Sequence, residues 1–474
     1  MSGGPLARRR EMGQRAANHD PADSLSLTPD RWNVATVPAQ RWAIPIAGTV
    51  ALFTFALLQL IHRLVPGTGA DLRAMIQGAT DLAAGRNIYT PALHFLARGD
   101  LRSILSMPVT VYVYPPPLAM VLRPLSHLPS RDALMVWDAL NAGLLALLFV
   151  LIIRVSRVRS WRQLLLVGAI YGFFPLNMGL GTGQIDILLT LLGLVIYLLY
   201  HRGMLRRAGL VLGLMALIKP TIGVLLLFFI CRRAWPTVVS CAVTLMAGGA
   251  ASLAAVGWGV LWRYRNVTAG WANDFGVLPL NQSPHGLILR LLSPRLDAPP
   301  TGAAALLAGA SEWAIAIGVI TLVARLLRHR EPESLPAGAL QYYAIFALLL
   351  LGLPFTENLH LVWLLPGVGI LFVTMAQQGR WHPWHAWASS AYLLLALPFA
   401  ESICWAADSS PLGRLASSIE CYGLLALAGT LTYVAFDRGH RLLRVVPWRW
   451  AMRQLEAEPP GRLRRWATSL GASG

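Results

Sequence analysis

The sequence is dominated by apolar runs long enough to cross a lipid bilayer as helices, which takes about 20 residues. The first run covers residues 43–62, and no small-residue cleavage site of the kind that ends a signal peptide follows it. Only 13% of the residues are charged, whereas soluble proteins carry about 25%. The sequence therefore predicts an all-α polytopic membrane protein and excludes a secreted disulfide scaffold and an ordinary cytosolic enzyme. The further runs lie at residues 133–153, 163–178, 184–200, 237–260, 304–327, 339–354, 359–376, 384–403 and 415–436.

Residues 208–231 form one more apolar run, which Lys219-Pro220 interrupts near its centre. Proline removes a helix hydrogen bond and a lysine is costly in lipid, so we expect two half-helices that meet at Lys219. This places Arg206-Arg207 and Arg232-Arg233 on one side of the membrane. The total is then about twelve membrane segments, within a range of ten to twelve, with both termini cytoplasmic as the positive-inside rule favours. A single span would export the Arg-rich C-terminal tail.

The formal net charge is +18, but the arginines lie in short runs between apolar segments and form no single stripe. This pattern is typical of membrane anchoring and not of nucleic-acid binding. Lys219 is the only lysine in the chain. The cysteines, Cys231, Cys241, Cys404 and Cys421, show no CxxC spacing, so we expect free thiols.

Two long loops, residues 63–132 and 261–303, are expected on the outer side of the membrane. The first contains an amphipathic stretch that begins at Asp71 and is closed by Gly85, so we predict a helix that lies flat on the outer surface. Its apolar positions at helical spacing are Leu72, Met75, Ile76, Ala79 and Leu82.

Asp71 and Lys219 are the first candidates for chemistry. A carboxylate at the outer membrane surface can act as a general base on a hydroxyl, but Asp71 can also be a simple helix N-cap. A cation where two half-helices meet can stabilise a phosphate, but Lys219 can also extend to the membrane surface.

Other polar residues are weaker candidates. Asn281, Gln282, Ser283 and Arg290 can bind sugar hydroxyls or phosphate, or can belong to an ordinary solvated loop. Glu357, Asn358 and His360 lie in a later outer turn, where a lone histidine is usually structural. The pair His382 and His385 has no carboxylate nearby, so we predict no metal site there.

Several short motifs, in the same order along the chain, resemble signatures of glycosyltransferase family 87 and cover roughly residues 65–370. Those of the first outer loop are Asp71-Leu72, Gly85-Arg-Asn-Ile-Tyr89, Tyr114-Pro-Pro-Pro117, Arg123-Pro-Leu125 and Leu128-Pro129. The later ones are Gly183-Gln184-Ile-Asp186, Ala208-Gly-Leu-Val-Leu-Gly213 leading to Lys219-Pro220, Asn281-Gln-Ser283, and His360 with Val362-Trp363.

The resemblance implies a GT-C-like fold and a metal-independent, inverting glycosyltransferase without a cofactor. Its donor would be a polyprenyl-phosphate-linked sugar, mannose before arabinofuranose, and its acceptor an extracytoplasmic glycolipid or polysaccharide. Asp71 matches the family's catalytic base. Many relatives have an aromatic residue directly after this aspartate, whereas this chain has Leu72-Arg73, so Arg73 is expected to hold the donor phosphate or to lower the pKa of Asp71. The other substrate-binding candidates are Tyr114, Gln184, Lys219, Asn281, Gln282, Arg290 and His360.

The expected organisation is a disordered cytoplasmic tail at residues 1–40, a transmembrane catalytic domain at 41–440 and an Arg- and Trp-rich cytoplasmic tail at 441–474. The protein is expected in the plasma membrane, with its active site on the extracytoplasmic face and membrane lipids, but no nucleic acid, as partners. Two other classes remain open. A lipid-linked sugar transporter or flippase would use intramembrane charges such as Asp138, Asp186 and Glu312, and a non-catalytic scaffold would not need Asp71.

Overall fold

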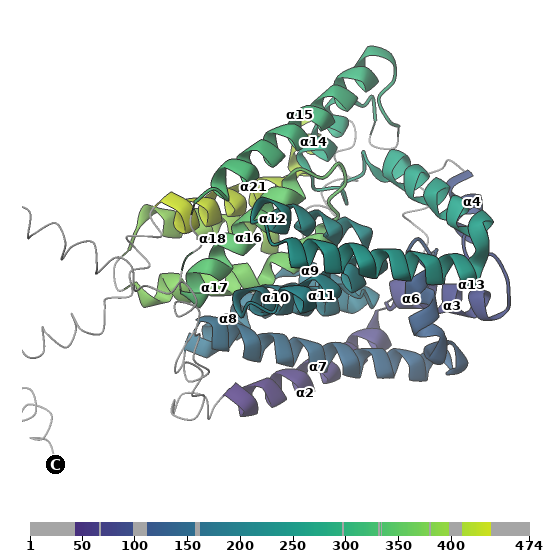
Figure 1. Cartoon of the computed structure of the whole chain (residues 1–474), viewed down its shortest axis with the longest axis horizontal. Helices are drawn as coiled ribbons and strands as arrows, with labels where there is room; N and C mark the ends of the chain where they lie inside the picture. Colours follow the sequence, from purple (N-terminus) through teal and green to yellow (C-terminus); the bar gives the residue numbers. More distant parts are fainter. Residues whose placement is uncertain are drawn as a thin grey trace, which may run out of the picture. The chain divides into compact units, whose positions relative to one another are not determined.

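The structure, a computed structural model, describes residues 43–65, 68–97, 111–156, 162–295, 298–329, 332, 334–378, 381–397 and 410–437. Over these residues the protein is all-α (Figure 1). This confirms the predicted fold class. The described residues also contain two isolated β-bridges, which pair Asn281 with Glu357 and Arg295 with Ala298. The tails predicted at 1–40 and 441–474 lie outside the described residues.

Six helical segments of the described chain are long and apolar enough to cross a membrane. They are α2 (Ala43–Leu64), α7 (Ser130–Ser156), α13 (Trp235–Phe275), α15 (Gly302–Leu326), η7 (Asn358–Leu364) continued by α17 (Leu365–Gln377), and α21 (Ile419–Thr432) with η8 (Tyr433–Asp437). The first two lie side by side (Figure 1) and expose leucines along their length, as lipid-facing helices do.

Shorter helices fill the space between these segments. Helix α16 (Leu335–Leu351) is buried along nearly its whole length, and α10 (Asp186–His201) packs against it. The run predicted as one span at 163–178 is instead two helices, α8 (Arg162–Tyr171) and α9 (Phe174–Thr182), because Phe173 leaves the helical conformation just before Pro175. The remaining helices are α4 (Thr90–Ala97), α6 (Pro116–Leu122), η5 (Arg123–His127), α14 (Pro284–Leu292), α18 (Pro383–Ala396) and α20 (Pro411–Ala416).

The amphipathic helix predicted in the first long loop is α3 (Ala70–Ala83). Its apolar side chains, among them Leu72, Met75 and Ala79, are buried against the helical bundle. Gly69 begins the helix and Gly85 ends it, both with a positive φ that glycine adopts without strain. The predicted helix and its end just before Gly85 are confirmed, although it begins one residue before Asp71. Its place on the outer surface of the membrane stays a prediction.

The break predicted at Lys219-Pro220 is also confirmed. Helix α11 (Leu205–Ile218) ends there, and η6 (Pro220–Leu225) and α12 (Leu226–Cys231) turn back. The next helix, α13, starts beside the start of α11, since the Thr237 and Ser240 hydroxyls donate to the backbone carbonyls of Leu205 and Arg206 at 3.0 and 2.7 Å. Because α11 and α13 run parallel from a common end, the second half-helix, formed by η6 and α12, returns the chain to the end where α11 began.

The second long loop is shorter than predicted. Helix α13 does not end near residue 260 but continues to Phe275, with a kink at Gly257, whose φ of 75° interrupts the helical geometry. The part beyond Gly257 packs on α4 through stacked aromatic rings of Phe95, Trp271 and Phe275. This part of α13 forms one wall of the cavity described next.

Candidate functional site

The first turn of α3 is held against the turn between α9 and α10. The Gly69 N–H donates to the carbonyl oxygen of Gly181 at 2.7 Å. Gly183 has a φ of +79°, and a Cβ at this position would lie 2.8 Å from the Cβ of Leu72. Glycine therefore allows both the backbone conformation and the close approach, which together place Asp71 beside Gln184.

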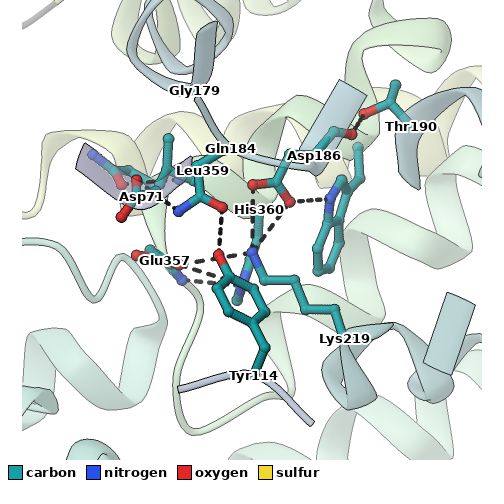
Figure 2. Close-up of polar contacts among 12 residues, drawn as sticks. Asp71, Tyr114, Gly179, Gln184, Asp186, Thr190, Lys219, Glu357, Leu359 and His360 are labelled. Atoms are coloured by element: carbon teal, nitrogen blue, oxygen red, sulfur yellow. Dashed lines mark hydrogen bonds and ion pairs between the residues drawn. The ribbon is translucent and has the colours of Figure 1, made fainter. Parts of the chain in front are cut away.

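Asp71, Gln184 and Tyr114 form a hydrogen-bonded chain (Figure 2). The Tyr114 hydroxyl donates to Gln184 Oε1 at 2.6 Å, and Gln184 Nε2 donates to Asp71 Oδ2 at 2.9 Å. Because the tyrosine holds the amide oxygen, the amide nitrogen is directed at the carboxylate. The N-cap of α3 is Gly69 and not Asp71, so the interpretation of Asp71 as an N-cap is wrong.

Lys219 is buried in an ion pair at the junction of the half-helices. Its Nζ lies 3.1 and 3.4 Å from the two carboxylate oxygens of Asp186, and Trp363 Nε1 donates to the same carboxylate at 2.8 Å. The lysine is only 8% exposed, which excludes the alternative in which it extends to the membrane surface.

Glu357 and His360 complete the cluster from the turn between α16 and η7 (Figure 2). Glu357 Oε2 lies 3.9 Å from Lys219 Nζ and 3.7 Å from His360 Nε2. The Glu357 backbone N–H donates to His360 Nδ1 at 3.2 Å, and the imidazole stacks on the ring of Trp363. The histidine is therefore held in one orientation from two sides.

A cavity of about 530 Å³ joins these groups. Its polar end is lined by Asp71, Tyr114, Gln184, Lys219, Glu357 and His360. Its apolar walls include Val111, Val113, Ile218, Tyr264, Trp271, Leu353 and Phe355. Such a volume suits a small-molecule ligand, and the division of the lining suits one with a polar head and an apolar tail.

Two carboxyl groups of this cluster, those of Asp71 and Glu357, lie outside the membrane-spanning segments and have raised pKa values. Burial raises the pKa of Asp71 above its usual value, although hydrogen bonds from Thr182 and Gln184 oppose the shift. Burial also raises the pKa of Glu357, to about 7, while Lys219 opposes this shift. On balance the pKa of Asp71 is therefore raised and not lowered, because loss of water around Asp71 has the largest effect. An effect of Arg73 on this pKa stays a prediction.

Six of the residues singled out in the sequence line one cavity: Asp71, Tyr114, Gln184, Lys219, Glu357 and His360. Arg73 does not join them. It follows Asp71 by two positions, and two residues of an α-helix turn the side chain by about 200°. Its Nη1 donates to the carbonyl oxygen of Thr68 at 2.7 Å. Its role in donor binding stays a prediction.

Asn281 and Gln282 lie in a buried hydrogen-bonded turn before α14, and Arg290 lies in α14; none of the three lines the cavity. Arg290 donates to the carbonyl oxygens of Leu278 and Asn281 at 2.8 Å and to the Ser418 hydroxyl. The amides of Asn281 and Gln282 bond to backbone groups, including those of Pro354 and Ser417. Together they support the turn that carries Glu357, and their part in substrate binding stays a prediction.

Asp186 and Trp363 belong to the cluster but were not among the sequence-based site residues, and Glu357 was only one of the weaker candidates. The sequence contained signals for each of them. Asp186 follows Gly183-Gln184 at the start of an apolar run, and Glu357 shares a turn with His360. Trp363 stands three residues after His360, which is one turn of a helix.

Comparison with known proteins places the chain in a family. One similar protein is the polyprenol-phosphate-mannose-dependent alpha-(1-2)-phosphatidylinositol pentamannoside mannosyltransferase of Mycolicibacterium smegmatis, which is 28% identical over 345 residues, covering 69% of this chain and 77% of the relative. No solved structure is significantly similar to the chain. The model of glycosyltransferase family 87 matches residues 112–354, about half of the chain, including Tyr114, Gln184 and Lys219. The protein is thus a membrane glycosyltransferase and belongs to glycosyltransferase family 87.

Proposed function

We propose that the protein transfers mannose from a polyprenyl-phosphate donor to an extracytoplasmic glycolipid or polysaccharide acceptor, with Asp71 as general base. The observation that carries the proposal is one cavity in which a carboxylate, Asp71, and a cation, Lys219, lie at the polar end of an apolar pocket. The mannosyltransferase relative uses a polyprenol-phosphate mannose donor, as its name states. The apolar walls offer a place for the isoprenoid chain.

In the proposed reaction an acceptor hydroxyl oxygen attacks the anomeric carbon of the donor. The hydroxyl proton moves to Asp71, and the bond between the anomeric carbon and the phosphate oxygen breaks. A single displacement needs one carboxylate and inverts the anomeric centre. The raised pKa of Asp71 supports this role, because a base whose pKa is closer to neutral keeps the proton more readily in the transition state.

The leaving group is a lipid phosphate that gains negative charge as the bond breaks. Among the described residues, Lys219 is the only lysine or arginine that lines this cavity. The proposal therefore assigns to Lys219 the stabilisation of the charge on the leaving phosphate. Asp186 accepts a hydrogen bond from Lys219, and Trp363 donates to the same carboxylate and lies with its ring centroid 5.3 Å from the ammonium group, so the two residues keep this group at the cavity. The proposal uses no metal, so transfer is expected to continue in the presence of EDTA.

The test is the Asp71→Asn variant in reconstituted vesicles, supplied with radiolabelled polyprenyl-phosphate mannose. We expect loss of transfer by at least about 100-fold, the lower end for a general base, with unchanged expression and melting temperature. Asp81→Asn is the matched control, since Asp81 lies on the same helix but pairs with Arg86 and does not line the cavity. Full activity of Asp71→Asn would contradict the proposal.

The donor and the class of activity are tested in the same vesicles. We expect covalent transfer from polyprenyl-phosphate mannose and not from polyprenyl-phosphate arabinofuranose. Movement of the lipid-linked sugar across the bilayer without a new glycosidic bond would instead support the transporter alternative. Profiling the glycolipids and polysaccharides of a deletion strain identifies the acceptor by the missing linkage.

A further inference from the structure

A second cavity, of about 560 Å³, lies beside α3 and shares no lining residue with the first. Its walls come from the end of α2, from α3, from the segment after η5 and from the start of α7. Asp71 lines the first cavity, whereas Arg73, about 200° further around the same helix, lines the second. Helix α3 therefore separates the two cavities.

The lining of the second cavity is basic. Arg63, Arg73, Arg131 and His62 contribute to it, and no Asp or Glu is among the lining residues. Three guanidinium groups around one hollow favour an anion, and their planar donors match the oxygen atoms of a phosphate. The hydroxyls and amides that complete the polar lining belong to Gln59, Gln77, Thr80, Ser126 and Ser130.

His62 lines this cavity and is held there by Asp138. Asp138, fully buried in α7, accepts a hydrogen bond from Gln59 Nε2 at 2.7 Å and lies 3.2 Å from His62 Nε2. The other ring nitrogen of His62, Nδ1, is buried and has no hydrogen-bond partner among the described residues.

The cavity lies next to surfaces that can contact the acyl chains of a lipid. It lies where α2 ends and α7 begins, and both are candidate membrane spans. The adjacent side chains Leu60, Leu64, Met135 and Val136 are exposed although they are apolar. A ligand with its charged group in the cavity can lay acyl chains on this surface, which a free ion cannot do.

We propose that this second cavity binds an anionic glycerophospholipid, with its phosphate at the arginines and its polyol head group in the space beside His62. The site is separate from the catalytic cavity, so the proposal does not depend on the identity of the donor or acceptor. A lipid bound there would contact α3 on the face opposite Asp71.

The test is lipid binding by the purified full-length protein in detergent, followed by native mass spectrometry. Phosphatidylglycerol is titrated into the wild type, into Arg63→Gln/Arg131→Gln and into Arg123→Gln. Arg123 is the matched control, because it is an exposed arginine of η5 that does not line the cavity. We expect the double variant to bind at least about tenfold more weakly and Arg123→Gln to bind like the wild type.

Competitors identify the source of the phosphate. Phosphatidylcholine, inorganic phosphate and undecaprenyl phosphate are added separately to the phosphatidylglycerol complex, each at the concentration of phosphatidylglycerol. None of them is expected to displace the lipid at equal concentration. Displacement by inorganic phosphate would reduce the site to an adventitious ion site, and displacement by undecaprenyl phosphate would assign it to the donor lipid. Equal affinity of all three protein variants would also overturn the proposal. Melting temperatures of the variants without lipid show that each is folded.

Discussion

Lys219 lies between two acids with different surroundings, Asp186 and Glu357. Asp186 is fully enclosed and receives hydrogen bonds from both Lys219 and Trp363, whereas the side chain of Glu357 is 24% exposed and lies at a longer distance from the lysine. Asp186 therefore fixes the position of the cation, and Glu357 is the acid that an incoming phosphate can replace.

Removing Lys219 should separate its structural from its chemical role. Lys219→Ala leaves the carboxylate of Asp186 buried without its cation, which costs about 3–5 kcal/mol in other proteins, so we expect a clearly lower melting temperature. The double variant Lys219→Ala/Asp186→Asn should recover most of the melting temperature but still transfer at least about 100-fold more slowly. If the double variant regains activity as well, Lys219 has only a structural role.

The pKa of Glu357, raised to about 7 by burial, predicts a pH dependence of donor use. Below this value the carboxyl group is neutral and leaves Lys219 to the phosphate; above it the carboxylate competes for Lys219. We expect kcat/KM for the donor to fall as the pH rises from about 6 to about 8, since this parameter reports groups of the free enzyme. In Glu357→Gln, which is neutral at every pH, this fall should disappear; a fall of equal size there would assign the titration to another group.

Single residues of the cavity were predictable where a charged residue stands beside or within an apolar run. Asp71 and Lys219 stood out because a charge is costly beside or within an apolar run. Asn281, Gln282 and Arg290 were chosen as polar loop residues, but their partners are backbone carbonyls and a serine far away in the sequence. Such long-range contacts leave no pattern in the sequence, so a buried structural arginine and a ligand-binding one look alike.

At the scale of elements, the position of α3 depends on one close contact with the turn at Gly183. Gly183→Ala adds a Cβ against Leu72 and a side chain at positive φ. We expect this variant to lose transfer activity by about 100-fold, because small displacements of a catalytic group have effects of this size. The measurement is the transfer rate together with the melting temperature.

Gly203→Ala is the control for the backbone effect. Gly203 also has a positive φ, of 73°, but a Cβ there would meet no atom within 4 Å. Both variants should lose a similar stability of about 1–2 kcal/mol from the left-handed conformation. Equal activity of the two variants would show that the contact between Gly183 and Leu72 does not position Asp71.

Helices were predicted well where hydrophobicity and periodicity agree, as in α3 and in the pair of half-helices at Lys219. The end of α13 was predicted too early because the chain becomes more polar after residue 260, with Arg263, Arg265 and Asp274, while the helix continues. Loss of hydrophobicity marks the membrane boundary and not the end of a helix. The extension is stabilised instead by aromatic contacts with α4, which are distant in sequence.

For the whole molecule, α10 provides a test of the predicted orientation in the membrane, because it begins at Asp186 in the candidate site and ends beside Arg202. We expect these two ends on opposite faces of the membrane. In a background without the four native cysteines, Ala84→Cys at the end of α3 should react with a membrane-impermeant maleimide in intact cells. Arg207→Cys should react only after permeabilisation, since arginine-rich turns stay cytoplasmic. The opposite labelling pattern would contradict the proposed extracytoplasmic site.

The return of the chain at Lys219-Pro220 has a consequence for how the cluster is assembled. Glu357 and His360 come after this point in the sequence and Asp71 before it. One additional crossing between α11 and α13 would invert every later helix and carry Glu357 and His360 to the compartment opposite Asp71. The turn that carries Lys219 thus also determines whether the number of membrane crossings before Glu357 is odd or even. It thereby allows Asp71 and Glu357, which lie far apart in the sequence, to reach the same side of the membrane.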